Sequence, residues 1–492
     1  MELPPHDACH RALASRDARF DGRIFVGVKT TGIYCRPICP ARTAKPENCT
    51  FFPSAAAAQE AGFRPCLRCR PELSPDAAAW RGTSNTVSRA LALIGEGVLD
   101  DEHDMPALAA RLGVGERHLR RLFQRHLGAP PIAVAQTRRV LFAKQLIQET
   151  RLSMTEVAAA SGFGSVRRFN DVFRSLYRRP ASSLRPRRGA TARAAGLSTV
   201  TLRLGYRPPY DWDAMIAFLD ARAVAGVECV SPERYARTIE LDGRVGSVEV
   251  RPGRGHLVAT IRFPEVRALL SIVARLRRLF DLDADVETIG AHLAGDRRLA
   301  PLVARRPGLR TPGSWDGFEL AVRAVLGQQV SIVAARRLAA ALVARAGTAV
   351  TGITGDPGLT HTFPTAARVA AADLSTMPMP RTRIAALSAL ARAAAADPRL
   401  LEPVGTSAEV VERLMKLPGF GPWTAQYWAL RALHDSDAFP AADVGLLRSA
   451  VVARGGKRPT PAALLARAER WRPWRAYAAQ HLWASGRDAA HA

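Results

Sequence analysis

The pattern of hydrophobic and polar positions divides the chain into segments of different type. Alternation in "VEVRP" and "LVATIRF" predicts a small sheet within 199–263, with helices around it. Helical, basic sequence fills 80–185, and Ala- and Leu-rich helical patterns dominate from about residue 312 onward. The stretch 178–196 is rich in Pro, Gly and Arg without periodicity, which predicts a linker. A chain of 492 residues is too long for one hydrophobic core, so roughly three or four domains are expected.

An internal repeat lies in the first helical region. "LAARLGVGERHLRRLF" (108–123) and "VAAASGFGSVRRFNDVF" (157–173) each predict a short helix, a turn built on G-x-G, and a basic helix. Asp104 and Ser165 are expected to cap helices of the two copies. A helix-turn-helix with a basic second helix suits the major groove of DNA, whereas the alternative is an ordinary solvated helical bundle. The side chains expected to face outward toward DNA are Arg117, His118, Arg121, Arg167, Arg168 and Asn170.

The cysteines are concentrated near the start of the chain. Cys35-x3-Cys39 and Cys66-x2-Cys69 form two short pairs. Two such pairs can complete a tetrahedral shell of four sulfurs, the preferred environment of structural zinc. A disulfide pair or free thiols are the alternatives. The remaining cysteines, expected to be ordinary small buried or surface residues, are Cys9, Cys49 and Cys229.

The excess of basic over acidic residues indicates which class of partner the protein binds. Lys and Arg number 70 against 44 acidic residues, which gives a net charge of +26 spread through folded-looking sequence. This favours a surface that binds a polyanion, with nucleic acid first, although a compositional bias of an Arg- and Ala-rich genome is the alternative. The sequence shows neither a secretory signal nor an apolar run long enough to span a membrane, so we expect a reducing cytoplasm.

A second turn rich in glycine lies in "LMKLPGFGPWTAQYWALRAL" (414–433). Gly419 and Gly421 flank a turn between helices, where backbone N–H groups can approach a DNA phosphate closely. An ordinary helix junction is the alternative. Downstream, "FPAADVG" places Asp443 where another helix begins, and a lone Asp there is most often an N-cap.

The sequence segments around the cysteines give a specific match to a known family. "KTTGIYCRPICPAR" and "ENCTFFPSAAAAQEAGFRPCLRCRPE" resemble the N-terminal domain of the Ada-type alkylation-response proteins over residues 7–79. The resemblance implies that Cys35, Cys39, Cys66 and Cys69 bind one Zn²⁺ as thiolates. It also implies that Cys35 accepts a methyl group from a methylphosphotriester in DNA. Methylation changes the formal charge of the centre from −2 to −1, which lessens repulsion from the phosphate backbone.

The repeat carries a second resemblance. Its two copies, joined by the long helix predicted for "IAVAQTRRVLFAKQLIQET", look like the AraC-family DNA-binding domain over residues 85–188. This resemblance implies binding to promoter DNA, and an activator of this kind implies RNA polymerase as a protein partner.

The C-terminal half resembles the AlkA-type 3-methyladenine DNA glycosylases of the helix-hairpin-helix superfamily. The match runs from "YRPPYDWDAMIAFLDARAVAGVE" through "RRPGLRTPGSWDGFELAVRAVLGQQVS" to "RWRPWRAYAAQHLWASG" and covers nearly all of 199–487. It implies that Asp443 is the essential ionised carboxylate. This group stabilises an oxocarbenium-like sugar as the damaged base departs, and water completes the hydrolysis.

The same resemblance implies an aromatic pocket that attracts cationic alkylated purines. For each aromatic residue the alternative is a core position. Two positions depart from the family: Gln329 replaces the Leu that often fills the gap left by the flipped base, and Val444 replaces a frequent aromatic. Trp423 stands where strand-cleaving relatives carry a catalytic Lys, so lyase activity is not expected. The pocket residues so implied are Phe218, Trp423, Tyr427 and Trp483.

Together these features predict a multidomain, mainly α protein with α+β parts. We expect a cytoplasmic, nucleoid-associated bacterial repair protein and transcriptional activator that demethylates phosphotriesters and excises alkylated purines. The alternatives are a methylation-responsive regulator with an inactive glycosylase-like scaffold, and a zinc-stabilised repair enzyme that regulates nothing. The predicted parts are a four-cysteine zinc domain at 1–79, an all-α double helix-turn-helix domain at 80–188, a linker at 189–198, an α+β domain with a small antiparallel sheet at 199–311, and an all-α helix-hairpin-helix glycosylase domain at 312–490.

Overall fold

The computed structural model describes residues 3–74, 85–100, 104–186, 199–350, 352, 355–402, 404–451 and 457–491. The chain divides into two compact units. The first comprises Met1–Pro208, Gly253–Ala274 and Leu282–Ala284, and the second comprises Pro209–Pro252, Arg275–Asp281 and Asp285–Ala492. The linker predicted at 189–198 and the boundary predicted at 79–80 lie outside the described residues, and the predicted domain borders stay predictions.

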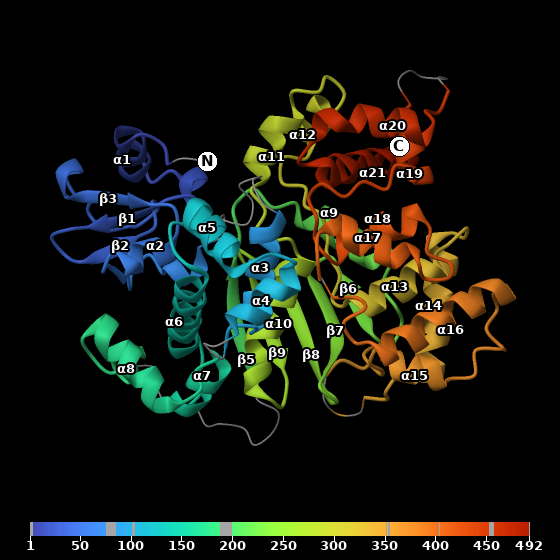
Figure 1. Ribbon diagram of the computed structural model, residues 1–492, viewed down its shortest axis with the longest axis horizontal. Coiled ribbons are helices and arrows are strands. Elements are labelled where there is room, and N and C mark those ends of the chain that lie inside the picture. The colour runs from blue at the N-terminus through green and yellow to red at the C-terminus, as the bar shows by residue number, and fades with distance from the viewer. Residues whose placement is uncertain are drawn as a thin grey trace. The chain divides into compact units, whose positions relative to one another are not determined.

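The N-terminal part of the first unit is a small sheet with short helices, drawn in blue in Figure 1. Its strand order is β3-β1-β2-β4. Strand β1 is antiparallel to β2 and β3, whereas β2 and β4 are parallel. Ser54 caps the second helix, because its side chain accepts a hydrogen bond from the Ala57 N–H. The elements are α1 (His6–Ala14), β1 (Phe25–Val28), β2 (Ile33–Cys35), β3 (Cys49–Phe52), α2 (Ala55–Glu60) and β4 (Arg64–Pro65).

Helices follow in the same unit and confirm the predicted repeat. Each copy is a short helix and a longer one joined by a tight turn, and a long helix connects the copies. In the first copy Gly113 ends the short helix with φ 68°, and Gly115 precedes the next helix. The elements are α3 (Asn85–Gly95), α4 (Met105–Leu112), α5 (Glu116–Leu127), α6 (Pro131–Glu149), α7 (Met154–Ala160) and α8 (Val166–Tyr177).

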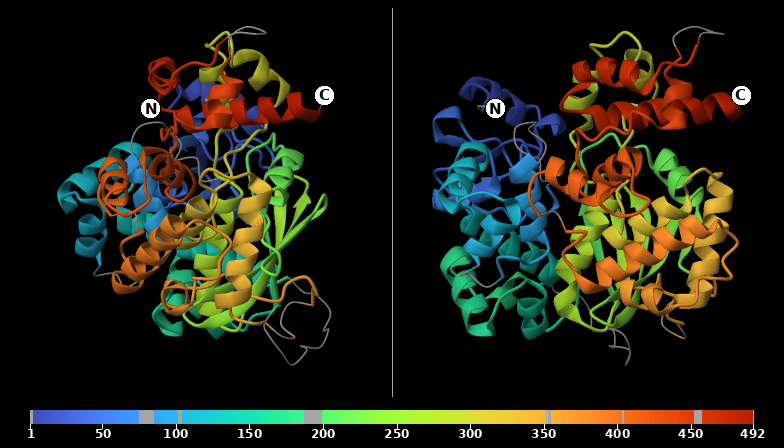
Figure 2. Two further views of the ribbon diagram at one scale, coloured as in Figure 1. Left: turned by 90° about the vertical axis from the view of Figure 1, so that its right-hand side faces the viewer. Right: turned by 45° about the vertical axis from the view of Figure 1, so that its right-hand side comes forward.

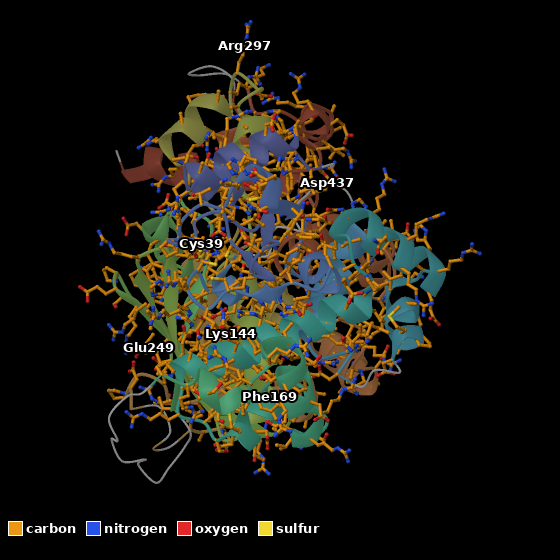
Figure 3. The ribbon with its side chains drawn as sticks, turned by 90° about the vertical axis from the view of Figure 1, so that its left-hand side faces the viewer. Cys39, Lys144, Phe169, Glu249, Arg297 and Asp437 are labelled. Carbon is orange, nitrogen blue, oxygen red and sulfur yellow. The ribbon has the colours of Figure 1, made fainter. Side chains whose placement is uncertain are left out.

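The cores of the two copies differ in composition. Aliphatic residues and Phe123 fill the first, whereas Phe169 and Phe173 pack in the second with ring centroids 4.7 Å apart; Figure 3 labels Phe169. Ser165 caps α8 as predicted, since it accepts from the Arg168 N–H. Asp104 occupies the N-cap position of α4 without a side-chain capping bond, because its backbone is not extended there.

The first part of the linker predicted at 178–196 contains a short helical turn. Residues Ala181–Leu184 form a short 3-10 turn, and both Ala181 and Leu184 are buried. A composition rich in Pro, Gly and Arg predicted a loop, but these two buried apolar side chains anchor this part of the stretch, and residues 187–196 lie outside the described residues.

The second sheet confirms the alternation read in the sequence. Its order is β5-β9-β8-β7-β6, with antiparallel pairing of β5 with β9, β6 with β7, and β7 with β8. The β7–β8 turn places Asp242 and Gly243 at φ 50° and 71°, as a two-residue hairpin turn requires. The strands are β5 (Thr199–Gly205), β6 (Glu228–Ser231), β7 (Arg234–Leu241), β8 (Arg244–Gly253) and β9 (His256–Arg262).

The remaining helices include a bundle with one hydrophobic core, seen in yellow to orange in Figures 1 and 2. Leu320, Val325, Leu387 and Trp428 are among its fully or nearly fully buried residues. No described helix is both long and apolar enough to cross a membrane. The helices are α9 (Trp212–Asp220), α10 (Leu269–Leu279), α11 (Val286–Leu293), α12 (Ala300–Arg305), α13 (Gly317–Leu326), α14 (Ile332–Ala346), α15 (Ala366–Ala371), α16 (Arg381–Ala396), α17 (Ser407–Met415), α18 (Pro422–Arg431), α19 (Val444–Ser449), α20 (Pro461–Ala468) and α21 (Arg475–His491).

Candidate metal centre and candidate active site

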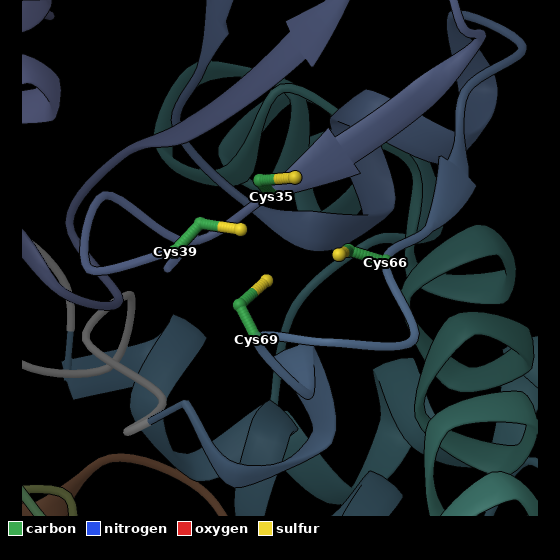
Figure 4. A group of neighbouring side chains, drawn as sticks. All are labelled: Cys35, Cys39, Cys66 and Cys69. Atoms are coloured by element: carbon green, nitrogen blue, oxygen red, sulfur yellow. The ribbon is translucent and has the colours of Figure 1, made fainter. Parts of the chain in front are cut away.

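The two cysteine pairs meet because of the local sheet topology. Cys35 ends β2, and Cys66 directly follows β4, which runs parallel to β2. Parallel neighbours end at the same edge, so the turns that carry Cys39 and Cys69 lie side by side. The four sulfur atoms lie within 4.8 Å of one another, and all four residues are buried. Figure 4 shows the four side chains converging on one point.

This donor set fits zinc. Four sulfurs around Zn²⁺ at about 2.3 Å lie roughly 3.8 Å apart, which agrees with the compact cluster. All the cysteines are free thiols, so the disulfide alternative is excluded for these four. Cys49 is buried nearby but is not part of the cluster. The four cysteines hold one zinc ion, as expected.

Proton sharing explains why a cation is needed here. The interaction of Cys35 with Cys39 is the largest of several effects that raise the pKa of Cys35 well above its ordinary value. The same interaction lowers the pKa of Cys39 to about 7. Neighbouring thiols without a metal therefore do not all ionise, and a bound cation offsets the repulsion between thiolates so that all four can be ionised.

Groups around the cluster stabilise it. The backbone N–H groups of Arg36 and Arg68 donate to Cys69 Sγ and Cys66 Sγ, each at 3.3 Å. The Arg36 guanidinium forms a buried ion pair with Asp21, with Nε 2.8 Å from Oδ1. Hydrogen bonds to ligand sulfurs and a nearby cation both favour the thiolate form.

Helix α6 contributes a further buried cation. Lys144 Nζ donates to the Cys66 carbonyl oxygen at 2.8 Å and lies 2.6 Å from Glu72 Oε2. The Lys144 side chain, labelled in Figure 3, is completely buried, and that of Glu72 is 1% exposed. The turn between Cys66 and Cys69 is thus attached directly to the helix that joins the two helix-turn-helix copies.

The second site centres on Asp443. This residue is the N-cap of α19 and accepts the Leu446 N–H at 2.9 Å, as the sequence indicated. Its carboxylate also accepts two indole N–H groups, from Trp423 at 2.9 Å and from Trp483 at 2.8 Å. Three donors therefore fix both carboxylate oxygens.

The predicted pocket aromatics gather beside this carboxylate. Trp423 and Tyr427 stack with centroids 5.4 Å apart, and Trp483 meets Tyr427 edge-on at 6.4 Å. Phe218 joins them through the buried guanidinium of Arg431. The Cζ atom of Arg431 lies 4.6 Å from the ring centroid of Phe218, 5.6 Å from that of Tyr427 and 5.2 Å from that of Trp483.

Arg431 and Arg222 were not singled out from the sequence. Arg222 lies over the Phe218 ring at 4.0 Å. Burial alone would raise the pKa of Tyr427, but the charges of Arg431 and Arg222 lower it below its usual value. The spacing of these residues in the sequence could have indicated both contacts. Each Arg follows an aromatic residue by four positions, which places the two side chains on the same face of a helix or of its continuation.

Gln329 and the glycine hairpin lie together. Gln329 is exposed in the turn between α13 and α14, with φ 56°. Gly419 has φ 81°, and a Cβ there would lie 2.7 Å from that of Ala386, so glycine is required. Gly421 is the exposed N-cap of α18. Gln328 Nε2 connects the two turns by donating to the Gly419 carbonyl oxygen at 2.7 Å.

The predicted DNA-facing side chains of the repeat point outward. All of them are exposed except Asn170, which is half-buried. On α5, Arg121 Nη2 lies 3.0 Å from His118 Nδ1. The exposed set is Arg117, His118, Arg121, Arg167 and Arg168.

Comparisons with known proteins agree with this order of parts. Family models match residues 8–72 as the metal binding domain of Ada, 108–187 as a helix-turn-helix domain, and 201–316 as the AlkA N-terminal domain. DNA-3-methyladenine glycosylase 2 of Escherichia coli is 36% identical over 57% of this chain and 95% of its own. The structure of 3-methyladenine DNA-glycosylase from Archaeoglobus fulgidus matches with a TM-score of 0.51 and 25% identity, covering 58% of this chain and 98% of that one.

Fold and sites together define a class of multidomain proteins that join a zinc module, a helix-turn-helix domain and a glycosylase fold. A protein of Mycobacterium tuberculosis named "Probable bifunctional transcriptional activator/DNA repair enzyme AlkA" is 43% identical over 97% of this chain and 96% of its own length. The chain belongs to this family of bifunctional transcriptional activator/DNA repair enzymes.

Proposed function

We propose that the chain repairs alkylated DNA by two chemistries and activates transcription in response to the damage. One observation supports this most strongly: a buried four-thiol cluster and a carboxylate surrounded by aromatic rings occur in the same chain. Methyl transfer and base excision act on different alkylation products, so the two sites complement each other.

In the zinc module, Cys35 is the proposed methyl acceptor. Bound zinc keeps the cysteine sulfurs as thiolates at neutral pH. The Cys35 sulfur forms a bond to the methyl carbon of a methylphosphotriester while the carbon–oxygen bond breaks. The released electron pair stays on the phosphate oxygen, which restores an anionic diester. Cys35 is consumed in the process, because the thioether that forms is no longer a nucleophilic thiolate.

The methyl transfer also supplies the proposed signal. Loss of one thiolate charge reduces repulsion between the module and DNA phosphates. The exposed basic residues of α5 and α8 then bind promoter DNA more tightly, and RNA polymerase is the proposed protein partner at the promoter. We place the protein in the bacterial cytoplasm, at the nucleoid.

In the glycosylase part, Asp443 is the proposed catalytic carboxylate for alkylated purines such as 3-methyladenine. The base departs with the electron pair of its bond to the sugar, and Asp443 stabilises the positive charge that develops on the sugar. Water then adds to the sugar carbon. Trp423 stands where a nucleophilic lysine would be needed for strand cleavage, so we propose that the enzyme is monofunctional.

Methyl uptake tests the first activity. Wild-type protein is incubated with DNA carrying labelled phosphotriesters, and the labelled residue is located by mass spectrometry. We expect the label on Cys35 alone. Cys35→Ser takes up none, whereas Cys49→Ser, which replaces a buried cysteine outside the cluster, takes up as much as wild type. Label on Cys69 in the wild type would show that the acceptor is wrong.

Base release tests the second activity. Methylated duplex DNA is incubated with the protein, and free methylpurines are measured by chromatography. We expect release of methylpurine with both strands intact until alkali is added. Release with immediate strand cleavage would contradict a monofunctional enzyme, and no release at all would favour an inactive scaffold.

A further inference from the structure

A buried guanidinium group lies among the rings of the proposed base pocket. Arg431 is 2% exposed, and its Cζ atom lies 4.6 Å from the ring centroid of Phe218, 5.6 Å from that of Tyr427 and 5.2 Å from that of Trp483. These rings come from α9, α18 and α21. Because arginine stays protonated in proteins, three helices contribute rings around one permanent positive charge.

The Arg431 guanidinium is fixed in this place. Its Nη1 donates to the Pro312 carbonyl oxygen at 2.8 Å, and its Nη2 donates to Gln480 Oε1 at 3.0 Å. Both of these acceptors are neutral, so they hold the group without cancelling its charge. The charge acts on the pocket: burial alone would raise the pKa of Tyr427, but the charge of Arg431, followed by that of Arg222, lowers it below its usual value.

This internal cation changes what the rings offer to a base. An aromatic ring attracts a cation through the negative face of its quadrupole, and a cation already on the ring uses part of that attraction. Phe218 is only 7% exposed and already contacts two guanidinium groups, that of Arg431 and that of Arg222 at 4.0 Å. A positively charged base that enters the pocket therefore meets partly occupied rings and a like charge behind them.

We propose that Arg431 is a specificity-determining residue that weakens the preference of the pocket for positively charged bases over neutral ones. This inference rests on the proposed glycosylase function. A base stacked on the ring face opposite to the guanidinium lies about 9 Å from it, and at an effective dielectric constant of about 20 two unit charges at that distance change an affinity roughly twentyfold. A neutral base does not meet this repulsion.

Binding of two duplexes that differ only in the charge of one base tests this role. One duplex contains 7-methylguanine, which is positively charged in DNA, and the other contains 7-methyl-7-deazaguanine, which has the same shape without the charge. A 2′-fluorine on the sugar of either nucleotide prevents base release, because it disfavours positive charge on the sugar. The measured quantity is the charge ratio, defined as Kd for the neutral duplex divided by Kd for the charged duplex.

Removing or neutralising the charge of Arg431 is expected to raise the charge ratio about ten- to thirtyfold. Arg431→Met removes the charge, and Gln480→Glu places a carboxylate against the guanidinium while keeping an acceptor for its hydrogen bond. Gln480→Leu is the matched control, since it alters the same position without adding a charge. It is expected to weaken binding of both duplexes equally and to leave the charge ratio as in wild type.

An unchanged charge ratio in both Arg431→Met and Gln480→Glu would overturn the inference, and so would an equal rise in Gln480→Leu. Circular dichroism checks that each variant is folded, and Gln480→Glu decides alone if Arg431→Met does not fold. Wild type that binds neither lesion duplex more tightly than undamaged DNA would overturn it too, since no base would then enter the pocket. Absence of methylpurine release from methylated DNA contradicts the proposed glycosylase, whereas a charge ratio that does not respond to these variants contradicts this inference alone.

Discussion

The carboxylate of Asp443 shows how one residue combines packing with chemistry. It caps α19, and it accepts the indole N–H groups of Trp423 and Trp483. These donors leave little freedom for the carboxylate to rotate. A charged group fixed in advance stabilises a transition state without first reorganising.

Removing one indole donor is expected to slow base release. Trp483→Phe keeps an aromatic ring but loses the 2.8 Å hydrogen bond to Asp443. Because two donors remain, we expect a fall in kcat of about tenfold, near the lower limit for a hydrogen bond to a charged group. Trp212→Phe is the control, since it removes an indole hydrogen bond to the Pro232 carbonyl oxygen instead. Equal rates in the two variants would contradict the role of the Trp483 donor.

His481 makes stability dependent on pH. Burial lowers the pKa of this histidine from its ordinary value of 6.5 to about 4. The unfolded chain therefore binds a proton that the folded chain resists, and stability falls as the pH drops from about 6.5 to about 4. The shift corresponds to a loss of about 3 kcal/mol over that range.

Urea unfolding at pH 7 and at pH 4.5, followed by tryptophan fluorescence, measures this effect. His481→Gln is expected to lose less stability on acidification than wild type. His292→Gln, which replaces an exposed histidine, is expected to behave as wild type. Identical pH dependence in wild type and His481→Gln would contradict the prediction.

Some features of these sites could be predicted from the sequence and others could not. Cysteine spacing indicated the four-thiol cluster, because short pairs converge on one ion whatever the fold. The contacts of Trp423 and Trp483 with Asp443 could not be predicted, because they join separate helices and depend on how those helices pack. The guanidinium of Arg431 was missed although its spacing of four residues from Tyr427 was visible, because that spacing does not show that the charge is buried among other rings.

At the scale of elements, α6 connects more than the two helix-turn-helix copies. Lys144 contacts the carbonyl oxygen of Cys66, and Gln145 donates to the Arg203 carbonyl oxygen of β5 at 2.7 Å. Glu149, at the end of the helix, lies 2.7 Å from Arg70 Nη2. The length of this helix was predictable from its periodicity, but its polar contacts were not, since buried Lys and Gln side chains resemble solvated ones in a sequence.

Lys144→Met is expected to destabilise the zinc module by about 3–5 kcal/mol. The substitution leaves the buried Glu72 carboxylate and the Cys66 carbonyl without the ammonium group. Urea unfolding followed by release of zinc to a chelating dye measures the loss. Lys29→Met, at an exposed position in the same module, is expected to change stability by no more than about 0.5 kcal/mol. Equal effects of the two substitutions would contradict a structural role for Lys144.

At the scale of the whole molecule, the net charge of +26 agrees with several DNA-directed surfaces in one chain. From composition alone, this charge could also have come from the amino-acid bias of an Arg- and Ala-rich genome. The exposed basic residues of α5 and α8 now account for part of the charge, whereas buried arginines such as Arg36, Arg237 and Arg431 have structural contacts. The fold class was predictable because each part carries its own pattern, whereas the predicted domain borders stay predictions.

The most direct test compares base release from methylated duplex DNA by wild type and Asp443→Asn. Asn has nearly the same shape and is an equally good N-cap, so α19 stays in place while the negative charge is lost. We predict that wild type frees methylpurines and that Asp443→Asn is slower by about a hundredfold or more. Equal rates for the two proteins would contradict a catalytic Asp443.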